Sequence, residues 1–418
     1  MTGGSEAAIT LVLGYPGSPF SEYPSQSQHE SEIPPTALYD MSSQEKRTVA
    51  SYRDAEELPP AVKQFLSNHT RDELCLSEFW FELLARYSAA EQEQPRIYVV
   101  TAAATGAVEC VLFVASSPSV RGAVGARRLV SLTNFYTMSY APIIDPTSES
   151  SQAALKALAA AIIRERPKWD VIELRSVIKE SPTTDNLLRA LRGAGLLVDT
   201  YHQFENWYQP LVGLSGEDYF KRRPTQVRNT ITRKLKRAKR EHRLAIEIHR
   251  TAQDLQVGIE QYQRIYARSW KEPELFPEFI PQLLRACAER GLLRLGVLTI
   301  DDDPAAAQIW LVTGSRATIY KLAYDERYRQ LSVGSILTKA MFDDAIEVDH
   351  VSEVDYGVGS ETYKLDWMSK RRHIVGIIAF NPRSIRGLLC AAKHFAGRLV
   401  RAVSMRRTGG ELEVRRRP

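Results

Sequence analysis

Residues Tyr320 to Trp367 read YKLAYDERYRQLSVGSILTKAMFDDAIEVDHVSEVDYGVGSETYKLDW. The segment begins in a β-prone run, 319–324, and small residues of the turn Leu331-Ser332-Val333-Gly334-Ser335 then interrupt it. Apolar residues recur at helical spacing from Ile336 to Ala345, which predicts a helix directly after the turn. The order strand, glycine turn, helix therefore sets the fold class of this half of the chain.

The turn is also a candidate anion site. Backbone N–H groups of Val333, Gly334, Ser335 and Ile336 would lie at the N-terminus of the helix, where intrahelical partners are absent. A helix N-terminus favours a phosphate by roughly 0.3–1 kcal/mol, and glycine lets the backbone approach it. The alternative is a helix start that is capped and binds nothing.

A second strand and a short helix follow. The strand is expected over 351–358, with Asp355 and Tyr356 near its end. The short helix is expected over 361–367, with Tyr363 and Trp367 on one face.

These residues carry a resemblance to a known family. The segment resembles the acyltransferase domain of CelD-like proteins of the GNAT superfamily, which are related to Fem-type aminoacyl ligases. The resemblance rests on Tyr324-Asp325, the turn 331–335, Asp355, Tyr363-Lys364 and Trp367. Pieces of it extend back to about Tyr52 and include the segment from Leu76 to Leu84 and the basic stretch after Tyr219. The turn departs from the family's usual Pro-Gly, because this chain has Val333-Gly334.

The resemblance implies a donor site for acyl-coenzyme A and no metal. The cofactor-binding residues would be Tyr324, Gln330, Val333, Gly334, Ser335 and Ile336. In the GNAT design, backbone N–H groups of the preceding strand polarise the thioester carbonyl, which places that role near Lys321 to Tyr324.

Three residues are candidates for the chemistry. Asp355 would remove or anchor the amine proton, because a carboxylate at the end of a central strand points into the ligand crevice; alternatively it caps the next helix. Tyr363 would protonate the leaving thiolate, or only pack beside Trp367. Lys364 would meet a phosphate or carboxylate, or be solvated.

The acceptor pocket is expected on the neighbouring strands. Its candidate residues are Gln308, Trp310, Tyr356 and Trp367, although Trp310 also suits a core position.

Composition agrees with a cytoplasmic protein of two cores. The 418 residues are 44% hydrophobic, enough to bury two cores. The most apolar region, 97–115, is interrupted by Glu109 and fits a hairpin better than a membrane span. The N-terminus has no secretory pattern, and the four cysteines lack paired spacing.

Positive charge is concentrated in one stretch. Residues 221–243 hold 11 Lys and Arg and one acidic residue, Glu241, whereas the remainder of the chain has 44 basic and 49 acidic residues. Val227, Ile231, Leu235 and Ala238 give it a narrow apolar stripe, which predicts an amphipathic helix. It is either solvated, or it contacts the phosphates of a donor or an RNA, or it lies on an anionic membrane. The helix expected from Arg383 to Arg401 is also basic and amphipathic, and could lie on a membrane too.

The order of elements predicts an α/β (α+β) protein of two tandem GNAT-like mixed-sheet domains flanked by helices and joined by the basic helix. The predicted segments are a disordered tail (1–48), a first domain without a donor loop (49–212), the basic linker helix (213–250), a second, donor-binding and catalytic domain (251–382) and a basic C-terminal helix and tail (383–418). The first domain has Ala141 to Pro146 where the second has its glycine turn.

Three functions fit these features. The first is an N-acyltransferase that moves an acyl group from coenzyme A to an amine of an envelope polysaccharide, lipid precursor or small metabolite. The second keeps the fold and takes aminoacyl-tRNA as donor, as Fem-type ligases do. The third is a non-catalytic module that docks to membrane or nucleic acid through its cationic helices.

Overall fold

A computed structural model describes residues 46–88, 93–117, 125–359 and 361–414, with side chains as far as Val400. The predicted disordered tail lies outside the described residues except at its end. There β1 (Arg47–Tyr52) pairs with β2 (Gln94–Ala102), so Arg47 and Thr48 are part of the sheet rather than of the tail.

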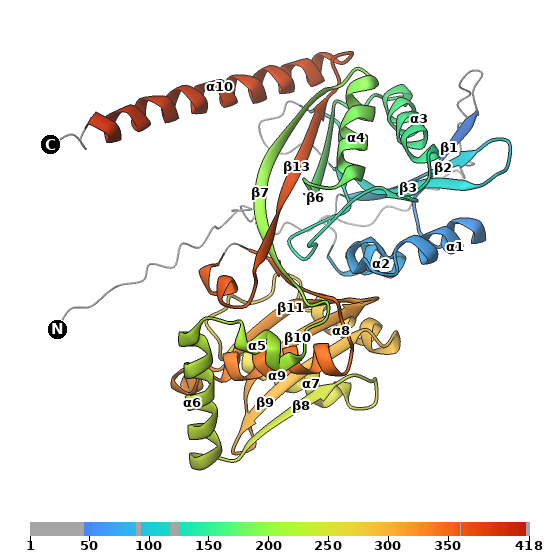
Figure 1. The fold of residues 1–418 in the computed structure, drawn as a ribbon. Helices are drawn as coiled ribbons and strands as arrows, with labels where there is room; N and C mark the ends of the chain where they lie inside the picture. The colour runs from blue at the N-terminus through green and yellow to red at the C-terminus, as the bar shows by residue number, and fades with distance from the viewer. Residues whose placement is uncertain (1–45, 89–92, 118–124, 360, 415–418) are drawn as a thin grey trace, which may run out of the picture. The chain divides into compact units, whose positions relative to one another are not determined.

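The strands of the described chain form one mixed sheet in the order β1-β2-β3-β4-β6-β13-β7-β12-β11-β10-β9-β8, with β5 paired to β3 (Figure 1). The remaining strands of the first half are β3 (Val108–Ser117), β4 (Arg128–Ser131), β5 (Ile143–Ile144), β6 (Val171–Ile178) and β7 (Leu197–Pro210). Those of the second half are β8 (Leu244–His249), β9 (Leu293–Ile300), β10 (Asp303–Thr313), β11 (Arg316–Tyr324), β12 (Glu353–Val358) and β13 (Lys370–Phe380).

Helices flank the sheet in both halves. The first half contains α1 (Pro60–His69), η1 (Leu74–Leu76), α2 (Glu78–Tyr87), α3 (Ser150–Arg164) and α4 (Pro182–Gly193). The second contains α5 (Gly216–Lys221), α6 (Thr225–Glu241), α7 (Leu255–Ala267), α8 (Phe279–Glu289), η2 (Glu326–Leu331), α9 (Val333–Glu347) and η3 (Thr362–Asp366), followed by α10 (Ile385–Val414). None of the described helices is long and apolar enough to span a membrane.

Two long strands join the halves. Strand β13 of the second half pairs with β6 of the first half on one side and with β7 on the other. The C-terminal part of β7 also forms an antiparallel ladder with β12 on its other edge. The two halves therefore share backbone hydrogen bonds, and the predicted class of a mixed sheet flanked by helices is confirmed.

Helix α9 is fixed on the second half by burial. Its apolar residues Val333, Ile336, Leu337, Met341, Phe342 and Ala345 are each at most 3% exposed. Burial of one such large side chain stabilises the fold by about 1.5–3 kcal/mol. A Cβ atom at Gly296 of β9 would overlap the Met341 sulfur, so glycine there allows the helix its close approach.

Several predicted boundaries differ from the structure. The basic linker expected over 213–250 holds α5 and α6 and then β8, whose alternating LAIEIH sequence adds an edge strand beside β9. Helix α8 was not predicted, although Phe279, Leu283 and Cys287 give it a buried face.

Candidate functional site

A cleft opens where β11 and β12 separate. These parallel strands pair only over three positions, from Arg316 with Glu353 to Thr318 with Asp355. The residues that directly follow on both strands line a cleft of about 170 Å³ together with loops of both halves. The lining residues are Phe135, Tyr136, Met138, Lys271, Ile319, Tyr320, Lys321, Leu322, Tyr356, Val358, Glu361, Tyr363 and Lys364.

Strand β11 is irregular on the wall of this cleft. Its ladder with β10 shifts register so that Ile309 pairs with Lys321 and Trp310 with Ile319, which leaves Tyr320 as an extra residue. Such a bulge re-aims the backbone locally. Beyond Thr318, the edge of β11 that faces β12 has no strand partner among the described pairings, so its N–H groups are available to a ligand carbonyl.

The loop between α7 and α8 lies across the cleft and contacts the first half. Its Glu274 accepts a hydrogen bond from the Tyr136 hydroxyl at 2.8 Å and also binds the ammonium group of Lys321. Burial raises the pKa of Glu274, but Lys321 and the hydrogen bonds outweigh that effect, so the net shift of this pKa is downward. Glu274 is therefore a carboxylate that fixes the loop and Lys321 together.

Lys271, on the same loop, lines the cleft and has a pKa well below that of an ordinary lysine. Burial, and after it the positive charge of Lys321, lowers the pKa of Lys271 to about 8. No ion pair of Lys271 occurs within the part of the chain that the structure describes, and its ammonium lies 5.7 Å from the Trp270 ring. A lysine with a pKa near 8 is partly neutral at physiological pH and can accept a proton.

Tyr363 and Lys364 of η3 form the opposite wall. The Tyr363 ring is 43% exposed and meets Tyr356 edge-on at 5.7 Å. Burial and the carboxylate of Glu361 raise the pKa of Tyr363 above its ordinary value, so this phenol keeps its proton.

Lys364 is buried, in contrast to the solvated alternative. Its Nζ donates to the Val358 carbonyl at 2.6 Å and pairs with Glu361 at 2.9 Å. Burial lowers the pKa of Lys364, opposed by Glu361. Lys364 therefore holds the end of β12 in place.

Tyr363 and Trp367 do not share a face, because η3 is a 3₁₀-helix rather than an α-helix. Trp367 is only 4% exposed and stacks on Phe342 of α9. It lies outside the residues that line the cleft, in the core of the second half.

The predicted donor turn is the start of α9. Ser332 precedes it in the left-handed conformation with φ 55°, and Gly334 approaches Tyr324 so closely that a Cβ would lie 3.3 Å from its ring. The Ile336 N–H bonds to the Ser332 carbonyl at 3.0 Å, so the expectation that it is free was wrong. Val333 faces the core, and Val333, Gly334 and Ser335 supply the N–H groups that remain at the helix start.

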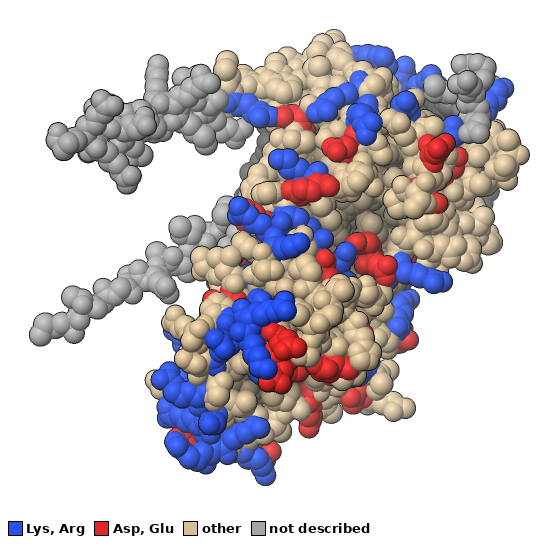
Figure 2. Space-filling model, viewed as in Figure 1, with Lys and Arg blue, Asp and Glu red and all other residues tan. Residues whose placement is uncertain are grey.

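The cationic helix α6 lies beside this turn. Lys234 donates from Nζ to the carbonyl of Gln330 at 2.5 Å, immediately before α9. Figure 2 shows Lys and Arg side chains gathered over α6, as the sequence predicts. Ile231 and Ala238 are buried against the second half, which confirms the narrow apolar stripe of this helix.

Gln308 and Trp310 are core residues rather than cleft residues. Gln308 is 1% exposed and donates to the Gly334 carbonyl at 3.1 Å and to the Thr338 hydroxyl at 2.6 Å. It accepts from the Trp310 indole at 2.9 Å. Gln308 and Trp310 thus support the start of α9 through hydrogen bonds. Tyr356, in contrast, lines the cleft.

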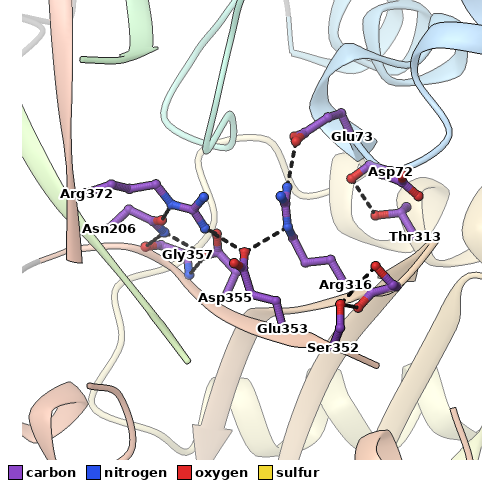
Figure 3. A network of polar contacts seen from close by, with 11 residues as sticks. Asp72, Glu73, Asn206, Thr313, Arg316, Ser352, Glu353, Asp355, Gly357 and Arg372 are labelled. Carbon is purple, nitrogen blue, oxygen red and sulfur yellow. Dashed lines mark hydrogen bonds and ion pairs between the residues drawn. The ribbon is translucent and has the colours of Figure 1, made fainter. Parts of the chain in front are cut away.

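Asp355 belongs to a polar network (Figure 3) and is not among the residues that line the larger cleft. One oxygen accepts from Asn206 at 2.6 Å and from the Gly357 N–H at 2.7 Å, and the other accepts from Arg372 at 2.9 Å. Asp355, Asn206 and Arg372 line a small pocket of about 20 Å³, together with Glu73 and Arg316 among others. The structure therefore does not bring Asp355 together with Tyr363 and Lys364 in the larger cleft.

Sequence reasoning missed Lys271, Glu274 and Tyr136. All three lie outside the regular elements, in loops whose meeting in space no sequence period reveals. The only local signal was the charged and aromatic run Trp270-Lys271-Glu272-Pro273-Glu274 between two helices.

Comparison with known proteins agrees with this geometry. A family model described as an acetyltransferase (GNAT) domain matches residues 225–365, from α6 to η3. The crystal structure of FemX is 13% identical, with a TM-score of 0.54 over 76% of this chain and 94% of that chain. A conserved protein of unknown function from Bacteroides thetaiotaomicron VPI-5482 is 10% identical, with a TM-score of 0.51 over 78% of this chain and 98% of its own.

No curated protein matches the sequence. The low identities to solved structures speak for the fold alone, and the narrower CelD-like resemblance stays a prediction. Residues 225–365 therefore form an acetyltransferase (GNAT) domain, and the fold of the chain is related to that of FemX.

Proposed function

We propose that the protein is an N-acyltransferase that moves an acyl group from acyl-coenzyme A to an amine. The observation that carries the proposal is the cleft at the separation of β11 and β12, with the N-terminus of α9 at the end of β11. Ligand pockets usually measure about 300–1,000 Å³. A cleft of about 170 Å³ suits the acyl group and the amine, and the phosphates of the donor would extend to the start of α9.

The residues of the cleft fit the proton movements of acyl transfer. The amine nitrogen attacks the thioester carbonyl, the C–N bond forms and the C–S bond breaks. Neutral Lys271 would take the proton that the amine loses, and Tyr363 would give its proton to the departing thiolate. Backbone N–H groups of β11 beyond Thr318 would stabilise the oxyanion between these steps.

Asp355 and Lys364 have supporting roles in this proposal. The three donors on Asp355 fix the turn at Gly357, and Lys364 fixes the carbonyl of Val358. Both residues thereby fix the end of β12 that borders the cleft. The alternative is that Asp355 is the base, and Asp355→Asn distinguishes the two roles.

The rim of the cleft favours an acceptor with an apolar part. Phe135 is 54% exposed, Val358 40% and Tyr363 43%, and all three line the cleft. Exposed apolar side chains that cluster at a site mark contact with an apolar ligand. Among envelope acceptors, this supports an amine-bearing lipid precursor over a free polysaccharide.

Aminoacyl-tRNA is the second candidate donor. The position of α6 beside the turn, through Lys234 and Gln330, would place several phosphate contacts next to the cleft. An RNA donor would show affinity that falls with salt, with a log–log slope of about −0.7 to −0.9 per phosphate contact. Binding of acyl-coenzyme A without binding of tRNA would exclude this donor.

The test is donor binding followed by turnover. Thermal shift with a panel of acyl-coenzyme A thioesters identifies the donor, and release of free thiol with a panel of amines reports transfer. Gly334→Leu should abolish donor binding, because the new side chain would displace Tyr324 and fill the helix start. Gly193→Leu is the matched control, since no atom lies within 4 Å of a Cβ at that α4 position. Unchanged donor binding in Gly334→Leu would overturn the assignment.

A further inference from the structure

Helix α10 presents two different faces. The inner face contacts the first half through Gly387, Ala391, His394 and Arg398, spaced by four, three and four residues. Ala391 is 3% exposed and packs on Val171 and Phe380. His394 and Arg398 both bind the carboxylate of Asp199 on β7, the former at 2.7 Å.

The outer face is apolar. Ile385 is 80% exposed, Leu389 60%, Leu399 67% and Val400 68%, and the partly exposed Leu388 and Phe395 extend the stripe. Ala392 and Ala396 lie between them and are also exposed. Isolated exposed apolar side chains are ordinary, but a stripe at helical spacing is a docking surface.

The charge of the segment selects its partner. From Asn381 to Gly410 the sequence contains seven Lys and Arg residues and no Asp or Glu. Arg386 and Lys393 are exposed and lie one after the other along one border of the apolar stripe. A second copy of α10 would bring cations against cations, whereas an anionic lipid surface complements both the stripe and its border.

The inner face sets the orientation. Because Gly387 lies against the backbone of Asn381 and Asp170, and Asp199 binds the next two turns, one side of the helix stays with the protein. Only the outer face is then free to enter the boundary between headgroups and acyl chains, with the helix parallel to the surface.

We propose that α10 docks the protein onto an anionic lipid surface through the stripe of Ile385, Leu388, Leu389, Phe395, Leu399 and Val400. This inference is independent of the acyl-transfer reaction, since it uses no residue of the cleft. It assigns a second, membrane-facing function to a helix that the GNAT-type chemistry does not require.

The experiment is sedimentation of the full chain with vesicles. Parent protein should sediment with vesicles of phosphatidylcholine mixed with phosphatidylglycerol, and about tenfold less with phosphatidylcholine alone. Leu389→Glu/Leu399→Glu should abolish sedimentation, and Arg386→Gln/Lys393→Gln should weaken it and reduce its salt dependence. The matched controls are Val212→Glu, at an 81% exposed apolar position elsewhere, and Lys236→Gln/Lys239→Gln on α6.

Two outcomes would overturn the proposal. One is sedimentation that Leu389→Glu/Leu399→Glu leaves intact, which would assign lipid binding to another surface. The other is a parent dimer that does not bind vesicles and that the same variant dissociates, which would make the stripe an interface between copies of the chain. The melting temperature of each variant should stay close to that of the parent, because every substituted side chain is exposed. Arg386→Gln removes one exposed hydrogen bond, which Arg386 donates to the Gly125 carbonyl at 2.9 Å.

Discussion

Glu274 accepts a hydrogen bond from the Tyr136 hydroxyl at 2.8 Å, although the two residues lie 138 positions apart. The contact holds the loop between α7 and α8 beside the cleft. Tyr136, a residue of the first half, thereby lines the cleft together with Lys271 of that loop. The cleft is therefore built by both halves, and a domain with only the GNAT-like second half would lack one side of it.

The negative charge of Glu274 should raise the pKa of Lys271. Because the Glu274 carboxylate raises the pKa of Lys271 against burial, Glu274→Gln should lower this pKa below about 8. If neutral Lys271 is the base, the rate rises with pH through the pKa of Lys271, and this rising limb of the pH–rate profile should then move to lower pH. Tyr136→Phe is the matched control, since it removes one hydrogen bond, worth about 0.5–1.5 kcal/mol of stability, and keeps the charge. A limb that moves equally in both variants would contradict the electrostatic account.

Lys271 should act on the rate through its neutral form. Activity is expected to rise with pH through about 8, because a base must be unprotonated to accept the amine proton. Lys271→Met should remove this limb and lower kcat by roughly 10²–10⁴. Lys239→Met, at an exposed position of α6, is the control and should leave the profile unchanged.

Lys271→Met should also change how the free energy of unfolding depends on pH. The pKa of Lys271 is about 8 in the folded protein and 10.5 for an unperturbed lysine, so the unfolded state binds more protons between these pH values. Parent stability should therefore rise with pH across that window. Lys271→Met should be more stable than the parent at pH 7, where the cost of desolvating the half-buried charge is full, and this gain should shrink above pH 8. A stability difference that does not vary with pH would argue against a depressed pKa.

Periodicity and turn chemistry predicted the strand, turn and helix at the centre of the second half. The strand, turn and helix of 319–345 and the buried stripe of α6 follow from local patterns of apolar residues. Strand β8 was missed because a charged linker was expected to continue to residue 250, while LAIEIH gains its stability only from pairing with β9.

The site was less accessible to sequence reasoning. Gln308 and Trp310 lie on a central strand near the turn at Val333, and only the packing of α9 shows that they support the start of this helix. Asp355 lies where a crevice residue is expected, but its partners Asn206 and Arg372 come from two strands that cross between the halves. Such long-range partners determine whether a carboxylate is free or bound, and no local pattern encodes them.

Tyr363 should contribute through its hydroxyl rather than its ring. If it protonates the thiolate, Tyr363→Phe should lower kcat by roughly 10²–10⁴ with little change in donor affinity. Leu365→Ala, on the same short helix and 50% exposed, is the control for local disruption. Steady-state rates together with donor binding by calorimetry separate the two effects. Equal activity of Tyr363→Phe and parent would remove Tyr363 from the reaction and leave it as a wall of the cleft.

Asp355→Asn distinguishes a positioning residue from a base. Both carboxylate oxygens of Asp355 accept hydrogen bonds, so the amide of Asn would turn its N–H₂ toward Arg372 or toward Asn206 and Gly357. At least one buried donor would lose its acceptor, at a cost of about 1–3 kcal/mol in the free energy of unfolding. A positioning role predicts this loss in chemical denaturation, together with a modest fall in rate and a rising limb that persists near pH 8.

A base at this position predicts the opposite pattern. Stability would stay near that of the parent, kcat would fall by roughly 10²–10⁴, and the rising limb would disappear. Glu353→Gln is the matched control, because Glu353 binds the same guanidinium of Arg372 at 2.9 Å and also pairs with Arg316 at 3.0 Å. If Asp355→Asn and Glu353→Gln lose stability alike and keep the limb, the network of Figure 3 holds β12 at its distance from β11 and leaves proton transfer to Lys271.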